Sequence, residues 1–212
     1  MFLNKEVTPM DEDGADVDAT VDGQDDSPIV HETRNESGSL ISSVTVKNGV
    51  PDGETLLYDD QGQLTHRLLY ENGVLSGPAE FFLLGKPLMN TNFKNGLQEG
   101  EVTFFSNGIK AGVAHFQGGR FEGDFTSIDA FGNITRVAKY AAGQQNGECT
   151  IYYPDGTVME QSSYKNNVLD GDLVRYFPNG NIMETSSFEN GSQCGFIEKY
   201  DMKGKLTSRE EV

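Results

Sequence analysis

The stretch that decides the fold runs from Tyr140 to Gly171 and reads YAAGQQNGECTIYYPDGTVMEQSSYKNNVLDG. Its glycines Gly147 and Gly171 lie 24 residues apart. Between them the turn sequence 154–156 (Pro-Asp-Gly) separates two runs in which apolar and polar residues alternate, the pattern of half-buried strands. An Asn-Asn pair at 166–167 closes the second run with residues that tolerate positive φ. The stretch therefore predicts strand, turn, strand, turn: one β-hairpin in every 24 residues.

The same spacing recurs along most of the chain. Glycines in three parallel series, each with steps of 23 or 24 residues, account for 21 of the 25 glycines. One series lies near strand starts, one lies in Pro-Asp-Gly-like turns and one lies in Asn-Gly turns. The first series is Gly53, Gly77, Gly100, Gly123, Gly147, Gly171 and Gly195. A fixed period of this length is the signature of a repeat protein, in which each unit contacts mainly its neighbours.

The repeat predicts an all-β fold: an elongated, twisted, single-layer antiparallel meander. We expect about seven hairpin repeats of 23–24 residues over 46–212 and a degenerate half repeat over 28–45 that caps the sheet. The units that contain Gly85 and Gly108 are each one residue short. Periodic aromatic residues, one for each strand, are interpreted first as core.

Charge is distributed unevenly. The formal net charge is −17, and residues 1–27 contain nine acidic residues and one basic residue. This acidity disfavours direct binding to nucleic acid or to anionic membranes, since both are polyanions. Residues 1–27 are poor in large apolar side chains and are expected to form a disordered acidic tail. Three interpretations of the tail stay open: a solvated segment, an interaction tail for a basic partner, or a mimic of nucleic-acid charge.

Nothing in the sequence predicts catalysis. His31, His66 and His115 lie in different units, and units two apart are separated by about 20 Å in a linear sheet. Nucleophile, phosphate-binding and metal-binding motifs are absent, and the Asp-rich stretches lack the spacing of a calcium loop. We therefore expect no enzyme, no catalytic residue, no metal and no cofactor.

The two cysteines, Cys149 and Cys194, do not form a disulfide framework and are read as free thiols of a reducing compartment. The longest apolar run, Phe81 to Leu84, is far too short to span a bilayer, so no transmembrane segment is expected. These observations favour the cytoplasm, or the periplasm if a signal peptide has been removed.

Residues 152–156 (Tyr-Tyr-Pro-Asp-Gly) and 164–171 (Tyr-Lys-Asn-Asn-Val-Leu-Asp-Gly) resemble the bacterial variant of the MORN repeat. Its pattern is an aromatic residue, Asn-Gly, an apolar residue, a further Gly, a short strand, an aromatic pair and a turn Gly. Proteins with this resemblance are often grouped as YwqK-type antitoxins, encoded beside a toxin. The resemblance also implies immunity partners of secreted effectors, phospholipases among them. The unit at 116–140 departs from the pattern.

Strand alternation indicates where a partner would bind. If the first aromatic of each pair packs inward, the second points to the opposite face and forms a contact row. Acidic residues beside the turns would add an electronegative surface that suits a basic partner. The candidate partner-binding residues are Asp59, Asp60, Phe82, Phe105, Glu122, Asp124, Asp129, Tyr153 and Phe177.

The sequence thus favours an antitoxin or immunity protein that occludes a basic active-site region on a cognate toxin or effector, such as a nuclease or a phospholipase. Two alternatives stay open. One is a structural MORN-type scaffold for protein or membrane association. The other is a nucleic-acid mimic that acts through the acidic tail. A homodimer through the open ends of the sheet is also compatible with the repeat.

Overall fold

The computed structural model of the protein describes residues 27–212. The expected tail therefore lies outside the described residues, except for Ser27. The described part consists of strands and turns and contains no helix. The strands are β1 (Ile29–Arg34), β2 (Leu40–Lys47), β3 (Val50–Tyr58), β4 (Leu64–Glu71), β5 (Val74–Leu83), β6 (Lys86–Lys94), β7 (Leu97–Gln98), β8 (Gly100–Ser106), β9 (Ile109–Gln117), β10 (Arg120–Phe121), β11 (Gly123–Ile128), β12 (Ile134–Ala141), β13 (Gln144–Tyr152), β14 (Val158–Lys165), β15 (Val168–Tyr176), β16 (Ile182–Glu189), β17 (Ser192–Tyr200) and β18 (Leu206–Glu211).

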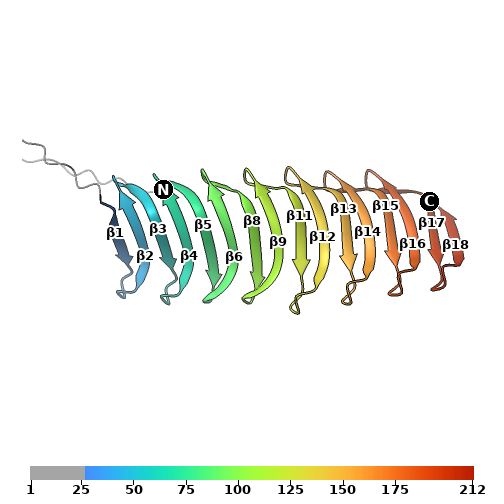
Figure 1. The fold of residues 1–212 in the computed structure, drawn as a ribbon, viewed down its shortest axis with the longest axis horizontal. Coiled ribbons are helices and arrows are strands. Elements are labelled where there is room, and N and C mark those ends of the chain that lie inside the picture. The colour runs from blue at the N-terminus through green and yellow to red at the C-terminus, as the bar shows by residue number, and fades with distance from the viewer. Residues whose placement is uncertain (1–26) are drawn as a thin grey trace, which may run out of the picture.

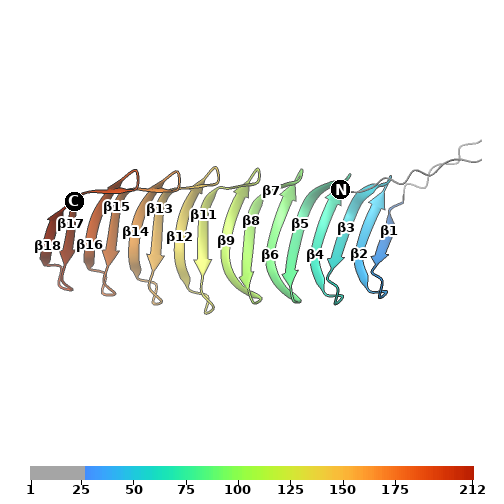
Figure 2. The same ribbon diagram turned by 180° about the vertical axis from the view of Figure 1, so that it is seen from behind.

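Each strand pairs antiparallel with its neighbour along the chain, so the sheet is a meander. The short strands β7 and β10 extend the turns beside them, while β6 pairs directly with β8 and β9 with β11. Figures 1 and 2 show the result from both sides: one open ribbon of hairpins from β1 to β18. The all-β, single-layer meander predicted from the sequence is confirmed.

The edge drawn at the top in Figure 1 carries the Asn-Gly turns, and we call it the Asn-Gly edge. Asn72 and Gly73 have φ values of 48° and 80°, as a type I′ turn requires. Next to this turn a β-bulge shifts the register of β4 and β5, and Gly77 lies in the bulge with φ 104°. A Cβ on Gly77 would lie 2.7 Å from Leu69 Cδ2. The bulge glycine is therefore required by its backbone angle and by the lack of space.

The opposite edge, the loop edge, carries two kinds of connection. Five-residue loops at 35–39, 59–63, 129–133, 153–157, 177–181 and 201–205 share two hydrogen bonds: the first N–H donates to the fifth carbonyl and the fourth N–H donates to the first carbonyl. The turns at 84–85 and 107–108 have only two residues, since Leu83 pairs with Lys86 and Ser106 with Ile109. These are the two shortened units, and strands β5 and β6 of the first are each one residue longer than β3 and β4.

One face of the sheet, which we call the ladder face, contains almost all of the buried side chains. Its central row contributes one buried residue from each of β3 to β6, β8, β9 and β12 to β16, none more than 8% exposed: Thr55, Leu68, Ala79, Thr91, Val102, Ala114, Ala138, Cys149, Ser162, Leu173 and Ser186. On the same face an aromatic side chain stands directly opposite every bulge glycine from Gly53 to Gly171, as Tyr70 does opposite Gly53 and Tyr164 opposite Gly147. Small residues in the row and glycines in the bulges leave room for these rings.

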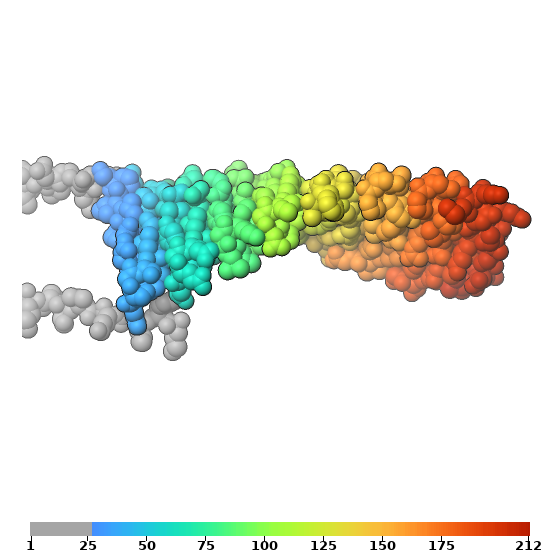
Figure 3. Space-filling view, turned by 90° about the horizontal axis from the view of Figure 1, so that it is seen from below, coloured from blue at the N-terminus to red at the C-terminus, as the bar shows by residue number. Residues whose placement is uncertain are grey.

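Aromatic side chains of neighbouring strands contact one another most extensively at the centre of the sheet. Phe104, Phe116, Phe121, Phe125 and Tyr140 form a chain of ring contacts on the ladder face, with centroids 4.3–6.4 Å apart. Several of these rings pack against the buried core residues of β8 and β9. Figure 3 looks from the loop edge and shows the ribbon turning along its length, with its narrowest profile near this centre. The expected right-handed strand twist explains the turn.

At the first edge of the sheet, the segment 28–45 forms more than the expected half repeat. β1 and β2 pair from Ile29 to Val46 and are closed by a five-residue loop like those further along. The segment is therefore a complete hairpin, and the sheet begins one strand earlier than a half unit would give.

Candidate protein-binding surface

The second face, the open face, is formed by the alternate side chains of the same strands. Its central row continues unbroken through Ser43, Leu56, Arg67, Glu80, Asn90, Thr103, Val113, Thr126, Val137, Thr150, Gln161, Val174, Thr185, Glu198 and Arg209. Only Thr150 in this row is buried. Threonine and valine predominate from β8 to β16, so the middle of this face is broad and free of bulky side chains.

An aromatic row lies beside the central row, towards the loop edge. Each member stands two residues beyond the central row on its strand, which places it on the same face. The row comprises Tyr58, Phe82, Phe105, Ile128, Tyr152, Tyr176 and Tyr200, and Met159 and Met183 occupy the same level on the strands between. A depression of about 200 Å³ opens between Met159, Tyr176, Met183 and the neighbouring Tyr153.

The predicted assignment of the aromatic pairs to faces is wrong in part. Phe81 and Phe104 pack inward on the ladder face, as the prediction has it. Tyr152 and Tyr176, the first aromatics of their own pairs, lie on the open face instead. Tyr153 and Phe177 lie beyond the ends of β13 and β15, inside the loops. The prediction took the residue four positions before each turn glycine as the first aromatic. In the two shortened units this residue lies on the ladder face and in the other units it lies on the open face, because a difference of one residue reverses the face. Counting five residues forward from the bulge glycine would have found the true row.

A row of carboxylates lies on the open face towards the Asn-Gly edge. Each carboxylate directly follows a bulge glycine, and all are exposed: Glu54, Glu101, Asp124, Glu148 and Asp172. Arg67 pairs with Glu54 at 3.4 Å and with Glu80 at 3.0 Å, and Lys139 Nζ lies 3.0 Å from Asp124. Glu148 and Asp172 instead accept hydrogen bonds from Gln161 and Ser187. Glu148 and Asp172 form no ion pair with any described residue.

Three of the predicted partner-binding acids hold the fold together. Glu122 accepts a hydrogen bond of 2.9 Å from the backbone N–H of Ala142 in the next hairpin. Asp59 accepts from the N–H groups of residues 61 and 63, and Asp129 from those of residues 131 and 133. Asp124 is engaged by Lys139, while Asp60 is exposed in its loop. The structure thus spreads the nine predicted residues over the open face, the loops and the turns instead of one row.

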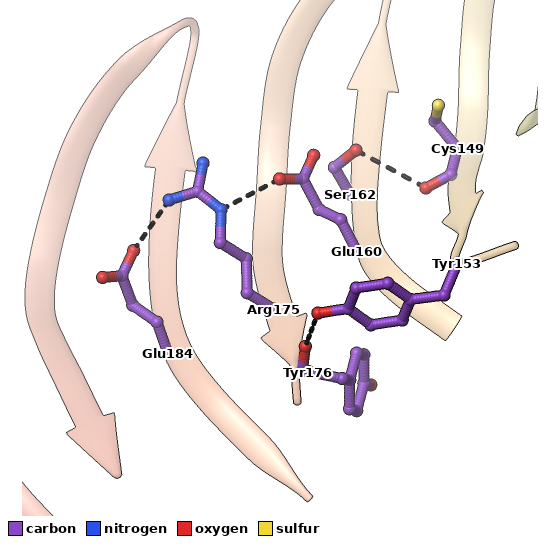
Figure 4. A network of polar contacts seen from close by, with 7 residues as sticks. All are labelled: Cys149, Tyr153, Glu160, Ser162, Arg175, Tyr176 and Glu184. Atoms are coloured by element: carbon purple, nitrogen blue, oxygen red, sulfur yellow. Dashed lines mark hydrogen bonds and ion pairs between the residues drawn. The ribbon is translucent and has the colours of Figure 1, made fainter. Parts of the chain in front are cut away.

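Two side chains connect neighbouring hairpins near the C-terminal half of the sheet, as Figure 4 shows. The hydroxyl of Tyr153 donates a 2.8 Å hydrogen bond to the carbonyl of Tyr176. On the ladder face Arg175 lies between Glu160, at 3.0 Å, and Glu184, at 3.2 Å. The hydrogen bond to Glu160, together with the charge of both carboxylates, raises the pKa of Arg175 despite its partial desolvation. These links explain a structural role for Tyr153 that the sequence did not reveal.

Groups with catalytic potential do not converge. His66 lies on the ladder face opposite Phe81, whereas His115 lies on the open face opposite Glu101. Cys149 and Cys194 are both free; Cys149 is buried and accepts a contact of 3.2 Å from Nε of Arg136. In residues 27–212 no three His, Cys, Asp or Glu side chains are placed to hold a metal ion. Nor does that part of the chain include a helix long and apolar enough to cross a membrane.

The C-terminal half supplies the similarity to known proteins. Residues 145–166 and 169–190 match the MORN repeat variant. These two units are similar to MORN-variant repeats. Each match covers one hairpin unit, from just before a bulge glycine to the turn or strand end that precedes the next. A comparison with curated proteins gives no match. The units before residue 145 share the bulges, turns and face pattern of the matched MORN-variant repeats, so the whole sheet is built on one repeated plan.

Proposed function

We propose that the protein is a non-enzymatic binding protein whose open face holds a partner with a basic surface. We further propose that this partner is a co-encoded toxin or effector, such as a nuclease or a phospholipase, and that binding neutralises it by covering its active-site region. The MORN-variant repeats are a repeat module suited to association, which supports the first part. The second part rests on the resemblance to bacterial antitoxins and immunity proteins.

The observation that carries the proposal is the juxtaposition of two rows on one face. Aromatic and methionine side chains from Tyr58 to Tyr200 lie on one side of the threonine-valine row, and the carboxylates from Glu54 to Asp172 lie on the other. Aromatic residues supply most hot spots in protein interfaces, and methionines adapt to varied partners. A parallel row of carboxylates steers a basic partner and fixes its register.

Charge on the open face favours a basic partner over an acidic one. Arg67 and Lys139 are each engaged by carboxylates, whereas Glu101, Glu148 and Asp172 form no ion pair with a described residue. A basic protein would therefore find free carboxylates without first breaking ion pairs. Such complementarity raises the association rate, and the effect falls as salt screens it.

A scaffold role is the second candidate. The repeat plan itself favours it, because MORN-variant repeats suit protein or membrane association in general. The net charge of −17 disfavours anionic bilayers and leaves protein association as the more compatible form of this role. Sedimentation with vesicles of zwitterionic and of anionic lipid separates a membrane scaffold from a toxin-binding protein.

The experiment is a binding titration of the full chain against the product of the adjacent gene, at low and at high salt. The test variant carries Glu101→Gln, Glu148→Gln and Asp172→Asn, which removes three exposed open-face charges at nearly constant shape. The matched control carries Glu36→Gln, Asp155→Asn and Glu210→Gln, which removes three exposed charges that lie in loops or on the ladder face.

We expect the open-face variant to associate more slowly and to lose most of its salt dependence, while the control binds like the natural protein. Co-expression should abolish the toxicity of the partner, and the open-face variant should rescue less well. The absence of a complex at low salt, together with no rescue, would refute the antitoxin proposal. Equal weakening of both variants would refute the assignment to the open face.

A further inference from the structure

The two ends of the sheet are unpaired edge strands, β1 and β18 (Figure 1). Within residues 27–212, β1 pairs with β2 alone and β18 pairs with β17 alone. The outer side of each strand therefore has backbone N–H and C=O groups with no strand beside them, which is a template for pairing with another chain. Charged side chains on such an edge disfavour pairing unless opposite charges meet across it.

Two arginines inside the sheet show how it accommodates a cation on the middle of three strands. Arg67 of β4 lies between Glu54 and Glu80 of the flanking strands, at 3.4 and 3.0 Å. Arg175 of β15 lies in the same way between a glutamate of β14, at 3.0 Å, and one of β16, at 3.2 Å, both directly opposite it. Each of these arginines thus has a carboxylate on both sides.

Arg209 of β18 has half of this arrangement. Its Nε lies 3.4 Å from Glu198, which is directly opposite on β17, and its guanidinium carbon lies 3.9 Å from the centre of the Phe196 ring. The other side of Arg209, where a second carboxylate would lie, is the open edge of the sheet.

The repeat fixes the register in which a further strand would add to β18. Where one hairpin adjoins the next, residues of the central open-face row lie directly opposite each other, as Thr185 and Glu198 do. On β18 this row contains Arg209, and on β1 it contains Glu32, since Glu32 pairs with Ser43. Adding β1 of a second copy beside β18 in the same pattern therefore places Glu32 directly opposite Arg209.

We propose that β18 of one molecule pairs antiparallel with β1 of a second copy of this chain, so that the two sheets join head to tail. In this register Glu32 of the second copy completes a glutamate–arginine–glutamate cluster around Arg209 on the open face. On the ladder face the same register places His31 opposite Glu210. Opposite charges thus meet across the edge on the open face, and a histidine meets a carboxylate on the ladder face.

The charges around the new pair allow this contact. Glu32 already accepts a hydrogen bond of 2.8 Å from Arg34 on its own strand, and a carboxylate has acceptor sites for a second guanidinium. The register also brings Glu211 diagonally near Glu32, and the side chain of Glu211 is exposed to solvent. A direct pair has Cβ atoms about 5 Å apart and a diagonal pair about 7 Å, so the attraction to Arg209 outweighs this repulsion.

Contacts between neighbouring loops show which side chains would meet at the loop edge. The side-chain amides of Asn179 and Asn181, in loop 177–181, donate 2.9 Å hydrogen bonds to the carbonyl of Met202 in the next loop. The third and fifth residues of one loop therefore reach the second residue of the loop that follows.

At the joined edges the corresponding residues are oppositely charged. The third and fifth residues of loop 201–205 are Lys203 and Lys205, both exposed, and neither forms an ion pair with any residue in 27–212. The second residue of loop 35–39 is Glu36, which is also exposed. This charge match involves none of the strand residues and supports the same head-to-tail register.

A closed dimer through one kind of edge is the poorer alternative. Two copies of the same edge strand join within one sheet around a two-fold axis, which pairs residues of the same face. For β1, the registers that pair all but one residue place two His31 or two Glu32 side chains opposite each other. For β18 they place two Arg209 or two Ser208 side chains opposite each other. Like charges directly opposite are destabilising, whereas the head-to-tail contact avoids them and repeats into filaments.

Sedimentation velocity of the full chain between about 1 and 300 µM tests the proposal, because an edge contact of this size is weak. We expect the mean mass to rise with concentration beyond that of a dimer. Arg209→Glu or Glu32→Arg alone should prevent the rise, since like charges then meet. An equimolar mixture of the two variants should regain it, because each edge again meets the opposite charge. Lys94→Glu and Glu71→Arg make the same charge changes within the sheet and should leave the rise unchanged.

A disulfide trap tests the register without changing a charge. Ser208→Cys with Thr33→Cys places two thiols directly opposite in the head-to-tail contact, and Cys194→Ser leaves only Cys149, which is 2% exposed. Air oxidation should give covalent dimers, trimers and longer species. Thr207→Cys with Thr33→Cys is the control, since these side chains would point to opposite faces and should not crosslink.

A natural chain that stays monomeric throughout, a dimer that does not grow further, or a mixture that fails to recover association would overturn the proposal. Equal crosslinking of the control pair would overturn the register. The toxin is absent from both experiments, so their outcome is independent of the proposed function.

Discussion

The bulge glycines are the residues on which the repeat depends most. Gly171 has φ 112°, and a Cβ there would lie 3.1 Å from Ser163 Cβ. An alanine would be strained by its backbone and would also push the neighbouring strand away. Gly156, in a loop, has φ 86° but no heavy atom within 4 Å of a Cβ position. Close approach is not a property of a whole series, since the bulge glycine Gly123 has open space and the turn glycine Gly191 would meet Val168 Cγ1 at 3.1 Å.

Gly171→Ala is expected to lower the free energy of unfolding by about 2 kcal/mol, from the left-handed backbone and the close contact combined. Gly156→Asn is the control, because asparagine adopts positive φ and the space is open; its loss should stay below about 1 kcal/mol. Urea unfolding measures both. Equal losses would show that the close approach to Ser163 is unimportant.

Leu84 and Asn107 offer a reciprocal test of backbone strain at equivalent turn positions. Leu84→Asn should raise the free energy of unfolding by about 1 kcal/mol, and Asn107→Leu should lower it by a similar amount. Thermal unfolding of the two single variants gives both signs. A Leu84→Asn variant that is less stable than the natural protein would mean that the exposed leucine contributes packing within the sheet.

At the level of elements, the five-residue loops are closed in two ways. In loops 59–63 and 129–133 the side chain of the first residue, an aspartate, accepts hydrogen bonds from the third and fifth N–H groups. In loops 153–157 and 177–181 the first residue is aromatic and proline follows, while Asp155 or Asn179 accepts from the fifth N–H. The aromatic side chain is thereby free to reach the next hairpin, as Tyr153 does.

Acid should loosen the loop at 129–133. The side chain of Asn133 and the backbone N–H groups of Asn133 and Phe131 lower the pKa of Asp129 from its ordinary value of 3.8. Because the folded pKa is the lower one, this stabilisation is present above about pH 4 and is lost as pH falls through the folded value. Amide exchange should show protection at residues 131 and 133 falling in that range.

Asp129→Asn is the matched control for this titration. Asn35 already makes the same contacts in loop 35–39, so the variant keeps the acceptor and removes the proton-binding group. Its protection should be independent of pH between 2 and 6, a range chosen to bracket the ordinary carboxyl pKa of about 4. A variant that loses protection in acid as the natural loop does would attribute the effect to another group.

The sequence predicted the elements well and their faces less well. Glycine spacing located every hairpin over 46–212, because turns and bulges both need positive φ. It misplaced Tyr152, Tyr153, Tyr176 and Phe177, since one-residue differences in turn length reverse a face. It also assigned Glu122 to a partner, although that carboxylate reaches a backbone N–H 20 residues away. The same contact recurs where Glu99 and Asp170 precede bulge glycines, so the acid before each bulge glycine could have been recognised as part of the repeat.

At the scale of the whole molecule, one face of the sheet contains the packing that stabilises the fold, and the other face is available to bind a partner. The ladder face holds the buried row and the aromatic rings, whereas the open face is left with threonines, valines, exposed carboxylates and the aromatic-methionine row. Strands pair only within a hairpin or with the adjacent hairpin. Adding a hairpin would therefore extend both faces of the sheet without requiring a new core. This division is what makes the open face available to a partner.

The most direct test of this division is photo-crosslinking in the complex with the product of the adjacent gene. A photoreactive phenylalanine analogue replaces Thr126 or Gln161 on the open face in one pair of proteins. In the matched pair it replaces Tyr140 or Tyr164 on the ladder face. We predict crosslinks to the partner from Thr126 and Gln161 and none from Tyr140 or Tyr164. Crosslinks from the ladder positions alone, or equally from both faces, would contradict the account.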